Sequence, residues 1–120
     1  IGPDGVYLLD RQAQQVVVLT HAGQVRYTFG EDVLIQPRAI AVDRANRVFV
    51  ADDADHSIKV FLAGEPLGAM GSLGAAPGRF NQITSLAADE NLLYVADSGN
   101  RRVQILLVTP ESMRPKGEGK

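Results

Sequence analysis

Three observations predict an all-β protein built from repeated antiparallel sheets. Short runs rich in β-branched and aromatic residues, such as 47–52 and 58–61, are separated by clusters of Gly, Asn, Asp and Pro. The pattern recurs regularly, since Asp10, Asp52 and Asp97 each end such a run and follow one another at intervals of 42 and 45 residues. No segment shows the 3.6-residue periodicity of an amphipathic helix.

Two further landmarks follow the same spacing. Phe29-Gly30 recurs as Met70-Gly71, and residues 39–43 (AIAVD) match residues 85–89 (SLAAD). A period of about 40–50 residues with several short strands in each unit is typical of β-propeller blades. The sequence therefore predicts a propeller-like repeat.

The clearest unit contains four expected strands, named A to D from the centre of the propeller outwards. Residues 40–42 are short and apolar, as an innermost strand A requires, and 47–52 and 58–61 form strands B and C. Residues 65–71 contain Pro and Gly, which an outer strand D tolerates because one of its edges faces solvent.

Applied to the whole chain, this pattern predicts three consecutive units and a tail. Residues 1–30 would hold strands B to D of a partial blade, 31–71 a complete blade and 72–108 strands A to C of another partial blade. Residues 109–120 contain two Pro and two Gly, and we expect a linker or a disordered tail there.

Composition narrows the class of function. The net charge of −2 argues against a nucleic-acid-binding surface, which normally has a surplus of Lys and Arg. The chain has no Cys, so disulfides and Cys-based zinc sites are excluded. The longest apolar run, 103–108, is shorter than the roughly 18–20 residues that cross a bilayer. The composition does not fix the cellular location of the protein, and a periplasmic or extracellular location is slightly favoured.

The third unit resembles an NHL repeat. The resemblance rests on residues 77–81 (PGRFN), 86–89 (LAAD) and 93–105 (LYVADSGNRRVQI), and it extends more weakly over 36–71 and 5–30. The second unit departs from the family pattern, because residues 53–56 read DADH where the family has Ser-Gly-Asn-Arg. The resemblance implies a partial β-propeller with blades of four antiparallel strands, from a ring that usually has six blades.

In such a propeller the B–C and D–A loops lie on one rim. Loops on a rigid scaffold often carry binding sites, so the binding candidates are Asp53, Asp55, His56, Arg79, Asn81, Arg101 and Arg102. The resemblance implies that Arg101 makes inter-blade hydrogen bonds, and we expect Arg79 and Arg102 to be exposed rim charges.

Other rim residues have structural interpretations. Asp52 and Asp97 are expected to accept backbone N–H bonds in the turns that follow them. Residues 98–100 (SGN) predict a turn, because Gly and Asn tolerate a positive φ. Two carboxylates and an imidazole fall within 53–56, but no further ligand follows at metal-like spacing, so we expect no metal or cofactor. His21 is expected on the opposite rim from His56.

These observations favour a binding or scaffold module that presents its rim loops to a protein or a surface polymer. One alternative is a fragment of an NHL-like propeller enzyme, a metal-dependent lyase or hydrolase whose active site lies mostly in other blades. A second is an RNA-binding NHL domain, which needs a basic rim. We expect the chain to be a fragment of a longer propeller, so the expected partners are another protein or the remaining blades. Self-association would also complete the ring, but the two ends of the sequence do not favour it.

Overall fold

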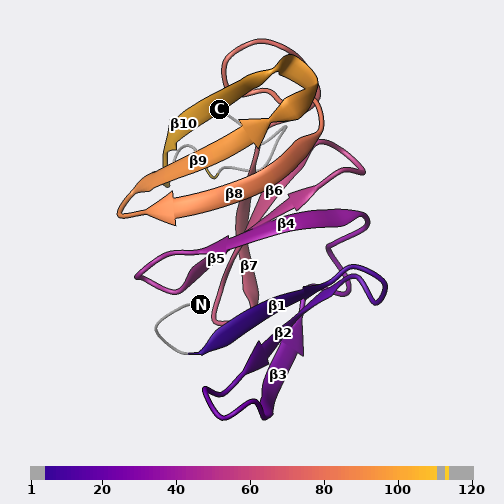
Figure 1. The fold of residues 1–120 in the computed structure, drawn as a ribbon, viewed down its shortest axis with the longest axis vertical. Helices are drawn as coiled ribbons and strands as arrows, with labels where there is room; N and C mark the ends of the chain where they lie inside the picture. Colours follow the sequence, from indigo (N-terminus) through magenta and orange to yellow (C-terminus); the bar gives the residue numbers. More distant parts are fainter. Residues whose placement is uncertain (1–4, 111–112, 114–120) are drawn as a thin grey trace.

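The strands form three antiparallel sheets stacked along the longest axis of the molecule (Figure 1). The structure is a computed structural model that describes residues 5–110 and 113. The first sheet contains β1 (Val6–Asp10), β2 (Gln15–Leu19) and β3 (Val25–Phe29). The middle sheet contains β4 (Pro37–Val42), β5 (Arg47–Asp52), β6 (Ser57–Leu62) and β7 (Glu65–Met70). The third contains β8 (Ile83–Asp89), β9 (Leu92–Asp97) and β10 (Arg102–Leu107).

Burial patterns show which sheets are covered on both faces. In β5 every residue after Arg47 is buried, whereas in β2 and β9 every second residue is buried. Side chains alternate between the two faces of a strand, so alternating burial marks a sheet covered on one face and continuous burial marks a sheet covered on both. The middle sheet is therefore the centre of the stack.

The core consists of two apolar layers. One layer lies between the first and middle sheets and includes Phe29 and Phe61, whose ring centroids are 5.0 Å apart. The other lies between the middle and third sheets and includes Phe49 and Phe80, which are almost fully buried. Each layer joins two successive units of the sequence repeat.

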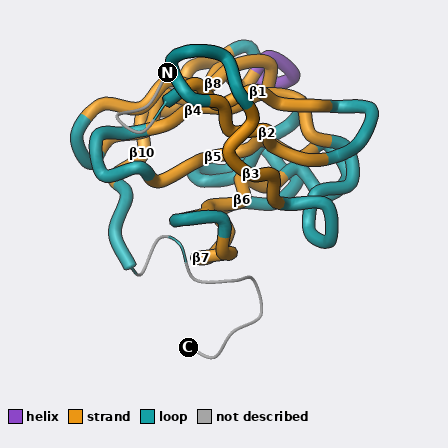
Figure 2. Tube along the Cα trace, turned by 90° about the horizontal axis from the view of Figure 1, so that it is seen from below, coloured by secondary structure: helices purple, strands orange, loops and turns teal. Residues whose placement is uncertain are grey.

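Within each sheet the strands follow one another in chain order. Figure 2 shows β1, β4 and β8 along one side of the molecule and β7 on the opposite side. Strand β4 contacts both β1 and β8, its neighbours in the adjoining sheets. The strands expected at 40–42, 47–52, 58–61 and 65–71 are confirmed, and β4 begins three residues before its expected start, at Pro37.

The third sheet has no fourth strand among the described residues. After β10 the buried Val108 donates its N–H to the Asn91 carbonyl, and Met113 packs into the core. The Met113 carbonyl accepts the Ala69 N–H at 2.9 Å, so this part of the predicted tail lies against β7 of the middle sheet. A Cβ on Gly68 would overlap the same carbonyl, which explains a glycine inside β7. The rest of that segment, 111–112 and 114–120, lies outside the described residues.

No helix within the described ranges is long and apolar enough to cross a membrane. The one helical element described there is η1 (Ser98–Asn100), a single 3₁₀ turn between β9 and β10.

Candidate binding rim

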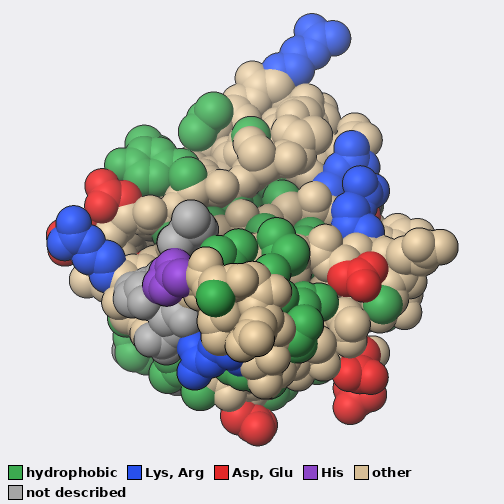
Figure 3. Space-filling view, turned by 60° about the horizontal axis from the view of Figure 1, so that its bottom comes forward, with side chains coloured by type: hydrophobic (Ala, Val, Ile, Leu, Met, Phe, Trp, Pro, Cys, Tyr) green, Lys and Arg blue, Asp and Glu red, His purple; other side chains and the backbone are tan. Residues whose placement is uncertain are grey.

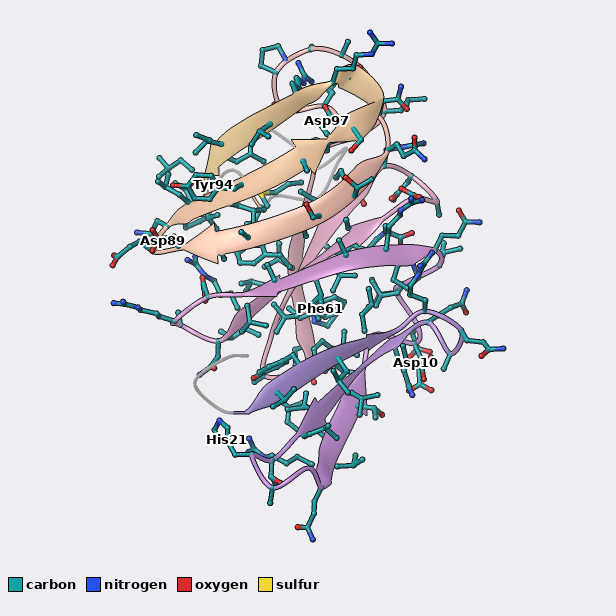
Figure 4. The ribbon with its side chains drawn as sticks, in the orientation of Figure 1. Asp10, His21, Phe61, Asp89, Tyr94 and Asp97 are labelled. Carbon is teal, nitrogen blue, oxygen red and sulfur yellow. The ribbon has the colours of Figure 1, made fainter. Side chains whose placement is uncertain are left out.

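The loops β1–β2, β5–β6, β9–β10, β3–β4 and β7–β8 meet at one end of the strands. Backbone hydrogen bonds join them: Asp53 donates its N–H to the Gln36 carbonyl at 2.9 Å, and Ser98 donates to the Gln82 carbonyl at 3.1 Å. Figure 4 shows Asp10 and Asp97 at this end of their strands and His21 at the other. We call this end the loop rim.

A buried carboxylate organises the loop rim of the middle sheet. Asp52 is 1% exposed and accepts hydrogen bonds from the backbone N–H groups of Ile35 (3.0 Å) and Gln36 (2.9 Å) in the β3–β4 loop. It also accepts the Ala54 N–H in the following turn and an ion-paired hydrogen bond from Lys59 Nζ at 2.9 Å. Asp52 therefore holds together two loops that are far apart in sequence.

Asp97 performs the same task in the third sheet with a different set of donors. It is fully buried and accepts the Asn81 N–H at 2.7 Å from the β7–β8 loop. Its other donors are Asn100 Nδ2 (2.9 Å), Arg102 Nε (3.0 Å) and Gln104 Nε2 (3.3 Å). The predicted backbone bond from the following turn is present at Asp52, where Ala54 donates it. At Asp97 the turn and β10 supply side-chain donors instead, and the one backbone N–H comes from Asn81 in the preceding loop.

Both carboxylates are held in the charged form. Burial alone raises the pKa of Asp52, but the hydrogen bonds from Lys59 and the three backbone N–H groups outweigh it and leave the pKa below its ordinary value. Burial likewise raises the pKa of Asp97, and its four donors together bring the pKa below the ordinary value. These two aspartates are structural anchors, because their lone pairs are already occupied.

The three turns after the aspartates share a backbone conformation that the sequence did not reveal. Gln14, His56 and Arg101 stand immediately before β2, β6 and β10, and each has a φ between 55° and 59°. In the third turn the left-handed residue is thus Arg101, and neither Gly99 nor Asn100 adopts a positive φ. Gly99 is needed for a different reason, since a Cβ there would overlap the carbonyl of Asn81.

Arg101 and Arg102 have different surroundings in the structure. The Arg101 side chain is exposed and makes no hydrogen bond within the described part of the chain, so the inter-blade role implied for it stays a prediction. Arg102 was expected to be an exposed charge, yet its side chain is only 29% exposed and is paired with Asp97. Its guanidinium also donates to the carbonyls of Ala75, Ala76 and Arg79, which fixes the β7–β8 loop.

The acidic residues of 53–56 are mostly paired with neighbouring cations. Asp53 forms an ion pair with Arg38 at 3.0 Å, and Asp55 accepts hydrogen bonds from Ser57 Oγ (2.6 Å) and Lys59 Nζ (3.2 Å). His56 is half-buried, and its Nδ1 is buried without a hydrogen-bond partner among the described residues. The structure brings these residues together in one turn, with Lys59 neutralising part of the acidic charge.

Arg79 and Asn81 lie on the β7–β8 loop, and both are exposed. Their backbone groups hold the loop in place: the Arg79 carbonyl accepts hydrogen bonds from Arg102 and Gln104, while the Asn81 N–H donates to Asp97. The Arg79 side chain donates no hydrogen bond within residues 5–110 and 113, so it is available to a partner.

A hollow of about 310 Å³ opens on the loop rim between the first and middle sheets. It is lined by Arg11, Ile35, Gln36, Pro37, Arg38 and Asp53. Only Asp53 of these was singled out from the sequence. Arg11 had a signal, because it follows Asp10 as Asp53 follows Asp52, but the first repeat is too degenerate to draw attention to it.

Within the described ranges, no group of three or more His, Cys, Asp or Glu side chains is placed to hold a metal ion. The hollow instead offers the Arg11 guanidinium, and the Arg38 guanidinium paired with Asp53, beside an exposed isoleucine. Such a surface suits recognition of carboxylate groups, because guanidinium groups pair well with them.

Comparison with known families adds one finding. The family model of the NHL repeat matches residues 80–106, which span β8, β9, η1 and β10 with the Asp97–Arg102 pair. No curated protein matches the chain. The match suggests that the sheets of this stack are propeller blades.

Proposed function

We propose that the three sheets are consecutive blades of a six-bladed β-propeller and that the chain is a binding module. The match of residues 80–106 to the NHL repeat supports the first part of this proposal. Its loop rim receives a protein segment or a surface polymer that carries carboxylate groups. A function belongs to a site and not to a fold, so the proposal rests on the rim itself.

The observation that carries the proposal is the contrast between a fixed rim backbone and uncommitted rim side chains. Asp52, Asp97 and Arg102 hold the loop backbones through buried hydrogen bonds. The exposed charged side chains of the rim loops include Arg11, Arg79 and Arg101, which have no hydrogen-bond partner in the described residues, and also Glu31 and Asp32. A surface that is ordered before binding loses less conformational entropy when a partner arrives.

The chemistry of the partner follows from what is left unpaired. Asp53 is paired with Arg38, and Asp55 shares Lys59 with the buried Asp52, so part of the acidic charge on this turn is offset. Two large apolar side chains, Ile35 and Leu73, are 58% and 57% exposed on the rim loops. Exposed apolar side chains beside arginines are typical of protein interaction surfaces. An extended acidic segment with apolar side chains fits this combination.

A peptide array and a polysaccharide array, each containing acidic and neutral members, test this proposal. We expect the chain to bind acidic members and the affinity to fall with salt, because exposed charges are screened. Arg101→Glu or Arg79→Glu should raise the Kd about tenfold or more.

The control is Arg44→Glu, which reverses another exposed arginine, paired with Glu90 at 3.7 Å, in the turn between β4 and β5 at the opposite end of the strands. It should leave the Kd unchanged. If Arg44→Glu and Arg101→Glu weaken binding equally, the effect comes from net charge and the rim assignment is wrong. Absence of binding to both arrays at low salt would also contradict the proposal.

A further inference from the structure

The strands β4 and β8 each contain one extra residue close to the loop rim. The register of β4 against β5 shifts just after Pro37, so Arg38 stands opposite no residue of β5. The register of β8 against β9 shifts just after Ile83, and Thr84 stands opposite no residue of β9. A bulge of this kind re-aims a side chain and is common next to binding sites. Arg38 and Thr84 are therefore equivalent positions of two successive repeats.

The side chain at each bulge contacts the residue that follows the buried aspartate of the same sheet. In the middle sheet Arg38 Nη1 donates to Asp53 Oδ2 at 3.0 Å. In the third sheet the hydroxyl groups of Thr84 and Ser98 share a hydrogen bond of 2.6 Å. The two repeats thus place different pairs, one ionic and one of hydroxyl groups, on the same backbone arrangement.

Both bulges lie on the side of the molecule where the sheets converge. Figure 2 shows β1, β4 and β8 along that side, and β4 contacts both of the others. The Arg38–Asp53 pair lines the hollow of about 310 Å³ between the first and middle sheets, together with Arg11. Figure 3 shows Lys and Arg side chains gathered with Asp and Glu side chains on the right-hand side of the view, the side on which Asp10 lies in Figure 4. The pairing of these charges therefore matters more than their sum.

The Arg38 guanidinium is held in place while most of its donors stay available. A guanidinium has five N–H donors, and Asp53 accepts from Nη1. Arg38 makes no other hydrogen bond within the described ranges, and its side chain is 33% exposed. A guanidinium binds a carboxylate best through two parallel N–H bonds. The hollow is lined by two arginines and one acidic residue, so a second carboxylate meets a net positive charge there.

We propose that Arg38 binds an acidic side chain of an extended peptide, that Asp53 positions the guanidinium for it, and that the bulge residue selects the group accepted at each repeat. At Thr84 and Ser98 the selected group is polar and uncharged. Ile35 lines the same hollow and is 58% exposed, and this apolar contact favours a peptide over a polysaccharide. The inference rests on the binding function proposed for the loop rim and names the residues that read the partner.

The first test compares two labelled peptides by fluorescence anisotropy. One alternates glutamate with valine, and the other has glutamine in place of every glutamate. We expect the full chain to bind the glutamate peptide more tightly, and Arg38→Ala to raise the Kd of that peptide about tenfold or more while the glutamine peptide is little affected. Equal effects on the two peptides, no effect on either, or no binding of the glutamate peptide would overturn the proposal.

The second test exchanges the pairs between the two repeats. Arg38→Thr with Asp53→Ser places the hydroxyl pair in the middle sheet without altering the net charge, and the preference for glutamate over glutamine should disappear. Thr84→Arg with Ser98→Asp creates a second ionic pair and should tighten binding of the glutamate peptide. Each pair already occurs at the equivalent place in the chain, and circular dichroism checks that both variants are folded. An unchanged preference in either variant would contradict selection by the bulge residue.

The matched control is Arg44→Thr with Glu90→Ser, which removes an ion pair at the opposite end of the strands and also leaves the net charge unaltered. It should keep the full preference for glutamate, and an equal loss there would rule out a specific role for Arg38. Array binding that depends on Arg79 and Arg101 but not on Arg38 would overturn this inference and leave the proposed function standing. Binding of acidic polysaccharides alone, with the same dependence on Arg38, would overturn the choice of a peptide.

Discussion

Arg102 Nε lies 3.0 Å from Asp97 Oδ2, and the same guanidinium reaches three carbonyl groups of the β7–β8 loop. One side chain thus joins the end of β9 to the loop that enters β8. Its neighbour Arg101, the last residue before β10, has an exposed side chain with no described partner. The pair provides an internal comparison between a structural arginine and a free one.

We expect Arg102→Ala to lower the free energy of unfolding by about 2–4 kcal/mol, because it leaves the buried Asp97 carboxylate without its cation. Arg101→Ala should change it by less than about 0.5 kcal/mol. Urea unfolding of both variants measures the difference. Equal effects of the two substitutions would show that the loop does not depend on the guanidinium of Arg102.

The lowered pKa values of Asp52 and Asp97 predict a loss of stability in acid. In the unfolded chain an aspartate has a pKa of about 3.9. Because the folded pKa values are lower, the stabilisation is fully present above the unfolded value and is lost as pH falls through the folded one.

Unfolding measured by urea at several pH values between about 7 and 2 should show this loss, and Asp97→Asn should flatten the acid limb of the curve while lowering stability near neutrality. Asp55→Asn is a suitable control, since 58% of the Asp55 side chain is exposed. The prediction fails if Asp97→Asn leaves the acid limb as steep as before.

Substitutions of Gly71 and Gly78, which lie in one loop, distinguish the cost of backbone strain from the cost of steric overlap. Both have a positive φ, 86° and 81°, but a Cβ on Gly71 would overlap the ring of Phe80 while a Cβ on Gly78 would meet nothing within 4 Å. Gly78→Ala should cost about 1–2 kcal/mol from the left-handed conformation alone. Gly71→Ala should cost about 1–3 kcal/mol more, because the ring has to move in a packed core. Thermal unfolding of both variants measures the difference, and equal losses would contradict the overlap.

Much of the fold could be predicted from the sequence because strand pattern and repeat spacing are local properties. The runs around Val50, Val60 and Val95 carry their own β-branched signal, and the repeated aspartates set the period. The all-β class and the strand positions of the middle sheet follow from these residues alone.

The site was less predictable because its partners come from distant segments. Nothing near Arg102 in the sequence shows that the carbonyls of Ala75 and Ala76 will lie beside it, since the path of the β7–β8 loop is set by tertiary packing. Met113 shows the same limit: its position against Ala69 in β7 could not be read from a segment rich in Pro and Gly. Arg11 joins the rim hollow only through the stacking of two sheets.

The left-handed residue at the end of each of the three turns determines how the sequence of these turns can change. Gln14, His56 and Arg101 have the same backbone geometry but carry an amide, an imidazole and a guanidinium. A residue in the left-handed conformation is destabilised by the contact between its Cβ and the backbone. All three residues have this Cβ, and their side chains differ only beyond it. Exchanging one such side chain for another therefore keeps the backbone conformation of the turn and changes only the contacts beyond Cβ, such as the hydrogen bond from Gln14 to the Ile35 carbonyl. Each repeat has a position at which the side chain can vary without a change of backbone conformation, so repeats of the same fold can present different chemical groups on this rim.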